Sequence, residues 1–476
     1  MPKDRVFWCL LTGLFALACS AGGGEEQKSR GSGQMGAGAT GGLNIGGGGG
    51  TDVNIGGINA SGGTNPGCPT SISGKVYDPS GTLPLYNVVV YAPSEPLAPI
   101  AEGAACETCD AHFSGRPVAA ALSDSAGNFR VENMPAGPGT RIVFQVGKWR
   151  REVTADITAC TDNPLDASLT RLPRNKSEGN LPKMAIVRGG SDAIECLIRK
   201  IGVDDAEFTT DAGDGRVHLY YNPSGNAMAG TGTMASGESL TDHTALYSSL
   251  DKMMGYDMVL LGCEGADDSF EGGTFSVQDF VNVRSYADQG GRLFGSHFNN
   301  RWVHWREYTE ETAPYPDVID FGSGAHGWDG MSAPVNATID ASFPKGLAMS
   351  EWLTNVGGSP TPGTVDIYNG EHSMSGLLHP SARQWITIPS DPQGHPNVPQ
   401  YVSWPTPLDG AECGRMVFSD VHVSGGSGDS GKEAFPTGCS ANALSGQQLA
   451  LAFMIFDLSS CVTPEDEPPT VPPIIF

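Results

Sequence analysis

The stretch that most constrains the fold of this chain is residues 283–302, which read VRSYADQGGRLFGSHFNNRW. An amphipathic run ends at a Gln-Gly-Gly helix stop, and the short apolar strand 292–294 follows it. The strand then breaks at a G-x-H-x-N pattern that contains His297 and Asn299. This order predicts a helix–turn–strand–elbow unit of a doubly wound α/β sheet, in which ligands lie beyond the carboxyl ends of the strands. We therefore expect His297 at such an end, with Asn299 taking the positive φ of the elbow.

Length and charge limit the class of protein. The 476 residues are enough for two or three domains with sizeable cores. The formal net charge is −25, from 28 basic and 53 acidic residues. This excess of acidic residues argues against nucleic-acid binding and against binding of anionic lipids through a polybasic segment.

The N-terminus is typical of an export signal. Lys3 and Arg5 precede the apolar stretch 6–17, which is too short for a comfortable membrane span. Residues 1–18 are therefore expected to be a signal peptide. The end of the apolar stretch, Ala18-Cys19, resembles a bacterial lipobox, although Ala16 stands where Leu is usual. The resemblance implies lipidation of Cys19 in an outer-membrane or cell-surface lipoprotein, and an ordinary cleaved signal is the alternative.

Residues 19–67 are expected to form a flexible tether, because this glycine-rich segment holds too little apolar mass to order itself. An exported chain permits disulfides. The candidate disulfide cysteines are Cys68, Cys106, Cys109, Cys160, Cys196, Cys263, Cys439 and Cys461.

Three pairings are considered among these cysteines. Cys68 and Cys160 flank the first domain and are expected to close it, and the C-x-x-C at Cys106 and Cys109 is expected to staple its own loop. Cys263 either bridges to Cys196 or keeps a thiolate.

Residues 68–172 read as a small β-sandwich, because short strands alternate with Pro- and Gly-rich turns. We expect strands at 71–78, 87–91, 141–145 and 149–154, and a hairpin over 120–131. The motif G-x-V-x-D at 74–78, the P-L-x-x-V-x-V that follows, and S-D-x-x-G-x-F at 123–129 resemble the carboxypeptidase regulatory-like (transthyretin-like) domain. That resemblance implies a non-catalytic module.

Residues 183–461 read as a parallel α/β domain. The expected elements are strands at 183–187, 256–265, 292–294 and 414–423, and helices at 193–201, 275–288 and 445–458. A plain Gly-Gly-Ser-Asp turn at 189–192 joins the first strand to the first helix. The acidic, proline-rich residues 462–476 are expected to be a disordered tail.

The order of these motifs resembles the class I glutamine-amidotransferase-like fold, a doubly wound, flavodoxin-like architecture, in its ThuA-like branch, with an insertion at about 305–410. The family's amidotransferases place a cysteine nucleophile at the elbow, where this chain has His297, and Cys263 lies nearer the oxyanion-loop position. Glutamine hydrolysis is therefore not expected. The order of the modules also resembles that of surface lipoproteins from Gram-negative bacteria.

The candidate catalytic residues are His297, His422, Asp420 and Glu264. His297 suits acid–base work or metal ligation, and its alternative is a histidine bound to loop backbone. Asp420 precedes His422 by two residues and is expected to orient its imidazole, unless the pair is a polar strand end. Glu264 supplies a carboxylate beside Cys263.

The insertion adds aromatic residues and histidines that suit a carbohydrate or peptide surface, or loop packing. They are His304, His326, His372, Trp302, Trp305, Trp328, Trp352, Trp385 and Trp404. Two functions follow: a membrane-tethered binding or structural lipoprotein, or a secreted hydrolase or carbohydrate-active enzyme that uses His297, His422 and Asp420, with or without a metal. Convergence of His297 and His422 would favour the enzyme.

Overall fold

The structure is a computed structural model that describes residues 68–106, 113–223, 229–264, 275–303, 318–321, 334–391, 394–408, 410–471 and 474. The expected signal peptide, Cys19 and tether lie outside these residues, as do Cys109, His304, Trp305, His326 and Trp328. Within the described part, no helix is long and apolar enough to cross a membrane.

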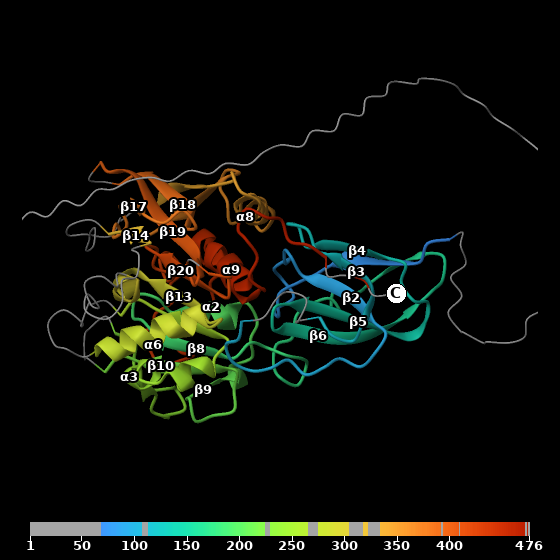
Figure 1. Cartoon of the computed structure of the whole chain (residues 1–476), viewed down its shortest axis with the longest axis horizontal. Coiled ribbons are helices and arrows are strands. Elements are labelled where there is room, and N and C mark those ends of the chain that lie inside the picture. The colour runs from blue at the N-terminus through green and yellow to red at the C-terminus, as the bar shows by residue number, and fades with distance from the viewer. Residues whose placement is uncertain are drawn as a thin grey trace, which may run out of the picture. The chain divides into compact units, whose positions relative to one another are not determined.

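Two small sheets form the N-terminal part (Figure 1). Their strands are β1 (Ser71–Lys75), β2 (Val89–Pro93), β3 (Pro117–Leu122), β4 (Asn128–Glu132), β5 (Gly137–Val146), β6 (Trp149–Ile157) and β7 (Asp162–Pro164). One sheet has the order β4-β1-β7 and the other β3-β2-β5-β6. Phe129 of β4 and Phe144 of β5 meet edge to face, with ring centroids 5.8 Å apart, so the two sheets share one core.

Two expectations for this part need correction. The strands β3 and β4 do not form the expected hairpin, because they belong to different sheets and the turn between them carries the chain from one to the other. The predicted disulfide between Cys106 and Cys109 is also wrong, because Cys106 bridges to Cys413 of the second part, 307 residues away. The bridge between Cys68 and Cys160 is confirmed.

The second part is built on one large sheet with helices packed against it (Figure 1). Its elements are β8 (Met184–Arg188), α2 (Ile194–Lys200), η1 (Asp205–Glu207), β9 (Phe208–Thr209), β10 (Val217–Tyr221), β11 (Thr241–Asp242), α3 (Thr244–Tyr247), α4 (Leu250–Met254), β12 (Met258–Leu261), α6 (Val277–Asp288), β13 (Arg292–Ser296), η2 (His297–Trp302), β14 (Ile319–Asp320), β15 (Val335–Ile339), α8 (Pro344–Asn355), β16 (Thr364–Ile367), β17 (Gly376–Leu377), β18 (Arg383–Ser390), β19 (Pro396–Thr406), β20 (Gly414–Ser419) and α9 (Gly446–Ser459).

Parallel pairing runs through β10-β8-β12-β13-β20, and antiparallel pairing continues through β19-β18-β15-β16. The mixed α/β, sheet-rich architecture expected from the sequence is therefore confirmed. The parallel strands are buried along their length, in keeping with their continuous apolar runs. The region expected as a loop-rich insertion instead extends the same sheet, because β15, β16, β18 and β19 pair edge to edge beyond β20.

The two long expected helices of this part are present and begin at capping boxes. Ser276 caps α6 with Asp279, and Ser445 caps α9 with Gln448, so each first turn satisfies its exposed N–H groups. Helix α9 is buried on nearly all its faces, which explains why its sequence is apolar throughout rather than amphipathic.

The tryptophans expected on binding loops are core residues where the structure describes them. Trp302, Trp352, Trp385 and Trp404 are each at most 1% exposed. The expected aromatic surface is therefore wrong for these four, and their burial stabilises the fold instead.

The segment expected to be a disordered tail is held at Glu465, which is 5% exposed. Its carboxylate lies 3.0 Å from Arg415 and 3.5 Å from Lys345, and both cations also pair with Asp457 of α9. Two buried cations require two buried carboxylates, so the chain is fixed at least to this residue.

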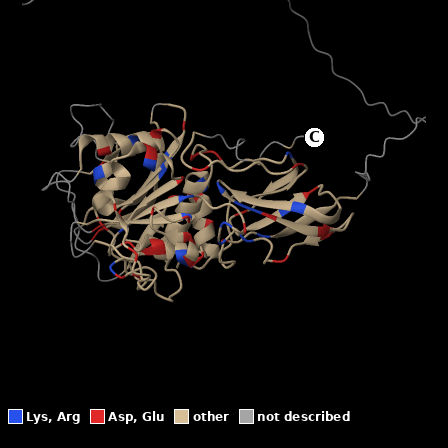
Figure 2. Ribbon diagram, turned by 90° about the horizontal axis from the view of Figure 1, so that it is seen from below, with Lys and Arg blue, Asp and Glu red and all other residues tan. Residues whose placement is uncertain are grey.

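Acidic and basic residues are interspersed along the described elements (Figure 2). Some of these charges pair inside the protein. Arg188 and Glu195 lie 2.7 Å apart and are almost fully buried. Lys148, in the turn before β6, lies 2.6 Å from Asp257. These charges support the fold rather than offer a surface to partners.

Candidate functional site

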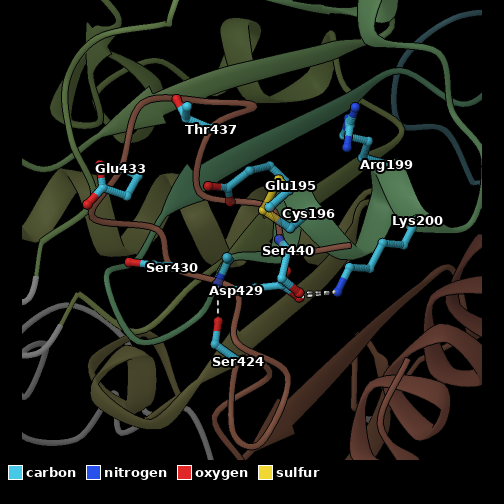
Figure 3. The surroundings of a disulfide bond; sticks show 12 residues. Glu195, Cys196, Arg199, Lys200, Ser424, Asp429, Ser430, Glu433, Thr437 and Ser440 are labelled. Atoms are coloured by element: carbon cyan, nitrogen blue, oxygen red, sulfur yellow. Dashed lines mark hydrogen bonds and ion pairs between the residues drawn. A yellow bond between two sulfur atoms is a disulfide. The ribbon is translucent and has the colours of Figure 1, made fainter. Parts of the chain in front are cut away.

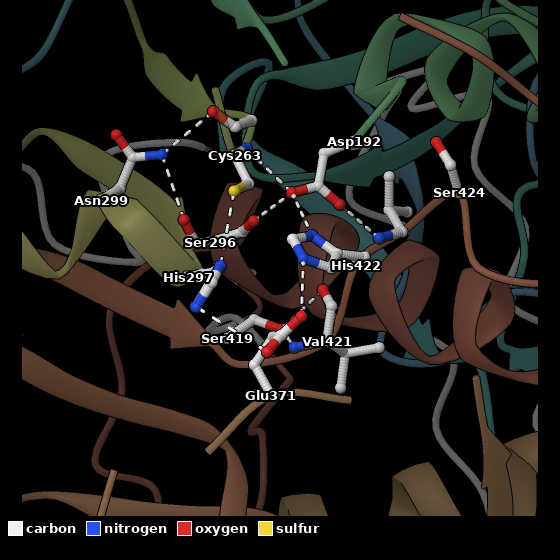
Figure 4. Close-up of polar contacts among 12 residues, drawn as sticks. Asp192, Cys263, Ser296, His297, Asn299, Glu371, Ser419, Val421, His422 and Ser424 are labelled. Carbon is white, nitrogen blue, oxygen red and sulfur yellow. Dashed lines mark hydrogen bonds and ion pairs between the residues drawn. The ribbon is translucent and has the colours of Figure 1, made fainter. Parts of the chain in front are cut away.

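The candidate site lies where four neighbouring parallel strands end. Asp192 follows β8, Cys263 follows β12, His297 follows β13 and His422 follows β20 (Figure 4). The chain adds β10 on one side of β8 and then β12 on the other side, so the strand order reverses between β8 and β12. Open α/β sheets bind ligands at such a switch point. His297 and His422, which the sequence placed at two separate strand ends, thus converge, with ring centroids 5.2 Å apart.

The elbow at His297 departs from the expected one in detail. The positive φ, +41°, belongs to His297 itself rather than to Asn299. The amide of Asn299 donates hydrogen bonds to the carbonyls of Leu261 and Gly262, at 3.2 and 3.0 Å, and to the carbonyl of Ser296 at 3.2 Å. Asn299 therefore ties the ends of β12 and β13 together, and this cross-link helps to hold an uncommon backbone conformation at His297.

Cys263, His297 and His422 form a buried cluster, referred to below as the Cys263 cluster. Each offers a sulfur or ring nitrogen, and these atoms all lie within 4.8 Å of one another. The Cys263 Sγ is 3.6 Å from the His297 Nδ1. Cys263 is not in a disulfide, so the alternative in which it bridges to Cys196 is wrong, and Cys196 pairs with Cys439.

Glu371 brings a carboxylate to the Cys263 cluster from the loop between β16 and β17. Its Oε1 is 3.3 Å from the His422 Nε2, and its Oε2 is 3.9 Å from the His297 Nε2. The Oε2 atom is buried and accepts no hydrogen bond from the described residues. A buried carboxylate oxygen of this kind is ready to accept a proton or a cation.

Asp420 has a different role from the expected one. Its carboxylate accepts hydrogen bonds from the backbone N–H groups of Ser373 and Met374, at 2.7 and 3.0 Å, and its carbonyl accepts one from Glu371 at 2.7 Å. Asp420 therefore positions the loop that carries Glu371, and it does not orient His422. Burial raises the pKa of Asp420 to about 6, despite these hydrogen bonds.

Asp192 is the carboxylate that orients His422, with 3.4 Å between Oδ2 and the His422 Nδ1. It also accepts hydrogen bonds from the Cys263 N–H at 2.8 Å, the Ser296 hydroxyl and the Val423 N–H. Burial alone would raise the pKa of Asp192, but the charge of His422 and these hydrogen bonds hold it below its usual value.

The imidazole of His422 shows the matching effect. Burial would lower its pKa, but the negative charges of Cys263 and Asp192 and the hydrogen bond to Glu371 raise the pKa well above its usual value. The protonated imidazole of His422 is thus favoured when these groups surround it.

The turn after β8 explains how Asp192 reaches Cys263. A Cβ on Gly189 would lie 2.1 Å from the Cys263 carbonyl oxygen, so only glycine lets the two strand ends approach this closely. The Gly-Gly-Ser-Asp turn expected to be plain is therefore part of the site.

Glu264 belongs to another buried network. Its carboxylate lies 2.7 Å from Arg301 and 2.8 Å from the His243 Nδ1, and it accepts a hydrogen bond from Asn222 at 3.1 Å. Burial raises its pKa, but His243 and Arg301 together bring it below the usual value. These partners give Glu264 the role of a structural anion beneath η2.

Sequence reasoning did not single out Asp192, Ser296 or Glu371. Asp192 and Ser296 carried a usable signal, because each stands at the carboxyl end of a predicted parallel strand. Glu371 carried none, because it comes from a loop that only the tertiary structure brings to the sheet.

Comparison with known proteins does not assign this chain to a family. No protein-family model matches this chain, and no curated protein does. A cytoplasmic protein from Salmonella typhimurium is similar over 50% of this chain and 87% of its own, with 12% identity and a TM-score of 0.26. A chain of a type II cohesin–X-dockerin complex from Acetivibrio cellulolyticus is similar over 28% of this chain and 85% of its own, with 15% identity and a TM-score of 0.16. Neither score is high enough to relate the folds.

Proposed function

We propose that this chain is an exported hydrolase whose α/β domain holds a zinc ion at the Cys263 cluster. The observation that supports it best is the meeting of a thiol and two imidazoles at the ends of three adjacent parallel strands, within 4.8 Å of one another. Zinc favours sulfur and imidazole ligands, and catalytic zinc sites use three protein ligands and keep one position open.

The distance between the ligand atoms of Cys263 and His297 suits that ion. Zinc bonds of about 2.3 Å to sulfur and about 2.05 Å to nitrogen, meeting at a tetrahedral angle, separate the two ligand atoms by about 3.6 Å. The Cys263 Sγ and the His297 Nδ1 are 3.6 Å apart. Asp192 on the Nδ1 of His422 is the carboxylate–histidine arrangement that orients metal ligands, and the other ring nitrogen, Nε2, lies 3.3 Å from the Glu371 Oε1.

The surrounding residues suit hydrolysis. A bound zinc would lower the pKa of a water and polarise a carbonyl, so amides and esters are the fitting substrate class. Glu371 is placed to accept a proton beside the two imidazoles, and Asp420 holds its loop in position. The Ser296 hydroxyl donates a hydrogen bond to Asp192 and so helps to hold this carboxylate in place.

The domain assignments belong to the same proposal. Leaving aside the two-residue strands β9 and β11, the parallel strands β8, β10, β12, β13 and β20, numbered 1 to 5 along the chain, have the order 2-1-3-4-5. This order supports a flavodoxin-like domain similar to the class I glutamine-amidotransferase-like fold. Two packed sheets with the quoted motifs support a transthyretin-like module before it. Cross-linking by several disulfides is typical of exported proteins, and lipidation at Cys19 would tether this one to a membrane.

A second candidate is a thiol hydrolase in which Cys263 attacks the carbonyl directly. It is favoured by the 3.6 Å approach of its Sγ to the His297 Nδ1, since a neighbouring imidazole activates a cysteine nucleophile. Cys263 is 0% exposed, however, which favours a ligand over a nucleophile.

The test measures zinc content and hydrolysis of p-nitrophenyl acetate by the purified full-length chain, before and after dialysis against dipicolinate. The variants are C263S and H297N, because asparagine tolerates the positive φ at residue 297. The control is H379N, at a histidine that hydrogen-bonds Ser381. We expect zinc affinity and hydrolysis to fall at least about 100-fold in both variants and to be unchanged in the control.

Four outcomes decide between the functions. Loss of hydrolysis on chelation with recovery on adding zinc supports the proposal. Hydrolysis that survives chelation but not C263S identifies the thiol enzyme. Zinc binding without turnover of esters or amides favours a binding lipoprotein, and a wild type that binds no zinc at the Cys263 cluster refutes the metal centre.

A further inference from the structure

A second group of metal-ligating side chains lies outside the Cys263 cluster. The Nδ1 atoms of His372 and His395 lie 2.9 and 2.6 Å from the same oxygen, Oδ2 of Asp391. The two rings are 4.6 Å apart between centroids. These three residues, named here the Asp391 cluster, offer two nitrogens and one oxygen within 4.8 Å of one another.

The backbone holds these three side chains in place. Asp391 and His395 both lie between β18 and β19, and the Asp391 N–H donates to the His395 carbonyl at 3.0 Å. The second oxygen of Asp391 accepts the His395 N–H at 2.7 Å. His372 follows Glu371 in the loop that Asp420 fixes through Ser373. The cluster is thus assembled from two separately anchored segments.

The carboxylate of the Asp391 cluster is buried, whereas its imidazoles are partly exposed to solvent. The Asp391 side chain is 0% exposed, whereas the His395 side chain is 57% exposed and that of His372 is 17% exposed. A buried carboxylate provides a fixed anion, and exposed imidazoles give an ion a path from solvent.

We propose that the Asp391 cluster is a second binding site for a divalent transition-metal ion, zinc in the first place. Imidazole and carboxylate ligands suit zinc, and three protein ligands leave room for water. Tetrahedral zinc would separate a ligand nitrogen and oxygen by about 3.3 Å. Binding therefore exchanges two short contacts to Oδ2 for metal bonds. The nitrogen–oxygen separations would grow from 2.9 Å at His372 and 2.6 Å at His395 by about 0.4 and about 0.7 Å, and the larger change falls on the exposed His395 ring.

The alternative is a pair of imidazoles that simply hydrogen-bond to one buried carboxylate. The two interpretations differ in what an added ion does. This proposal does not depend on the zinc hydrolase, since the Asp391 cluster shares no residue with the Cys263 cluster.

The experiment titrates the metal-depleted full-length chain with Co²⁺ and Zn²⁺, following ion content by equilibrium dialysis and the visible spectrum of bound cobalt. The variants are H395A and D391N, each alone and combined with C263S, and the matched control is H379A. H395A changes an exposed side chain, so it reports on binding even where D391N disturbs folding. Cobalt held by Cys263 shows a thiolate-to-metal band, which the Asp391 cluster cannot produce.

We expect the C263S chain to retain a cobalt site that lacks the thiolate band. Adding H395A or D391N to it should weaken the retained site at least about 100-fold, whereas H379A should not. In the chain with Cys263 intact, H395A should remove this site and leave the thiolate band, if present, unchanged. A C263S chain that binds no ion, or that binds it equally well with H395A, overturns the proposal whatever happens at the Cys263 cluster.

Discussion

Buried carboxylates show how single residues acquire different properties from their neighbours. Asp192 and Asp78 are both fully buried. Asp192 faces His422, and its pKa is lowered. Among the described residues, the carboxylate of Asp78 accepts hydrogen bonds from the Ser80 hydroxyl at 2.7 Å and from the Thr82 and Leu83 N–H groups at 3.0 and 3.1 Å, and it forms no ion pair there. Burial outweighs these donors and raises the pKa of Asp78 from 3.8 to about 6.

This shift predicts a pH dependence of stability. The folded state binds the Asp78 proton more tightly than the unfolded chain, so the stabilisation is complete below the unfolded pKa and is lost as pH rises through about 6. Of this stabilisation, about 2 kcal/mol should be lost between about pH 4 and about pH 7. D78N keeps an acceptor oxygen but removes the titration. Urea unfolding of both chains over this range should show a steeper decline for the wild type, and parallel curves would contradict the assignment.

At the scale of elements, the segment 424–440 depends on helix α2 (Figure 3). The disulfide between Cys196 and Cys439 joins them, and Lys200 of α2 lies 2.7 Å from Asp429. The Ser424 hydroxyl accepts the Ala193 N–H at 2.8 Å at the start of the same helix. Since Ser424 follows His422 by two residues, this attachment also supports one side of the candidate site.

Removing that disulfide should loosen the segment locally. The double variant C196A/C439A is expected to lower the free energy of unfolding by about 2–5 kcal/mol, because it releases a long loop closure in the unfolded chain. Limited proteolysis should then cut first within 424–440, whereas the C68A/C160A variant, used as the control, should leave that segment resistant. Equal resistance of the segment in both variants would show that the ion pair and hydrogen bonds suffice.

At the scale of the whole molecule, the proposed anchor decides where the protein acts. Because Ala18-Cys19 resembles a lipobox between an apolar stretch and glycine-rich residues, we propose a lipid on Cys19.

The corresponding variant is C19S, with C9S as the control, since Cys9 lies within the expected signal peptide. We expect C19S to move the protein from the membrane fraction to the soluble exported fraction, because a lipid chain supplies most of the membrane affinity. C9S should remain with the membranes. Fractionation in which C19S also stays there would argue against lipidation.

The sequence by itself determined the local elements and their order. Continuous apolar runs, glycine stops and capping residues act over a few neighbours, so β8, β12, α6, β13, β20 and α9 could be located, as could His297 and His422 at strand ends. The bridge between Cys68 and Cys160 was also predictable, because both flank one module.

Only the tertiary structure decided which distant groups meet. Asp192 rather than Asp420 orients His422, Glu371 arrives from a loop, and Cys106 crosses to Cys413 instead of stapling its own loop. Each of these contacts joins residues far apart in the chain, and no local propensity carries that information. The buried tryptophans have the same cause: composition makes them equally suited to a binding surface or a core, and only the packing of the extended sheet against its helices selects the core.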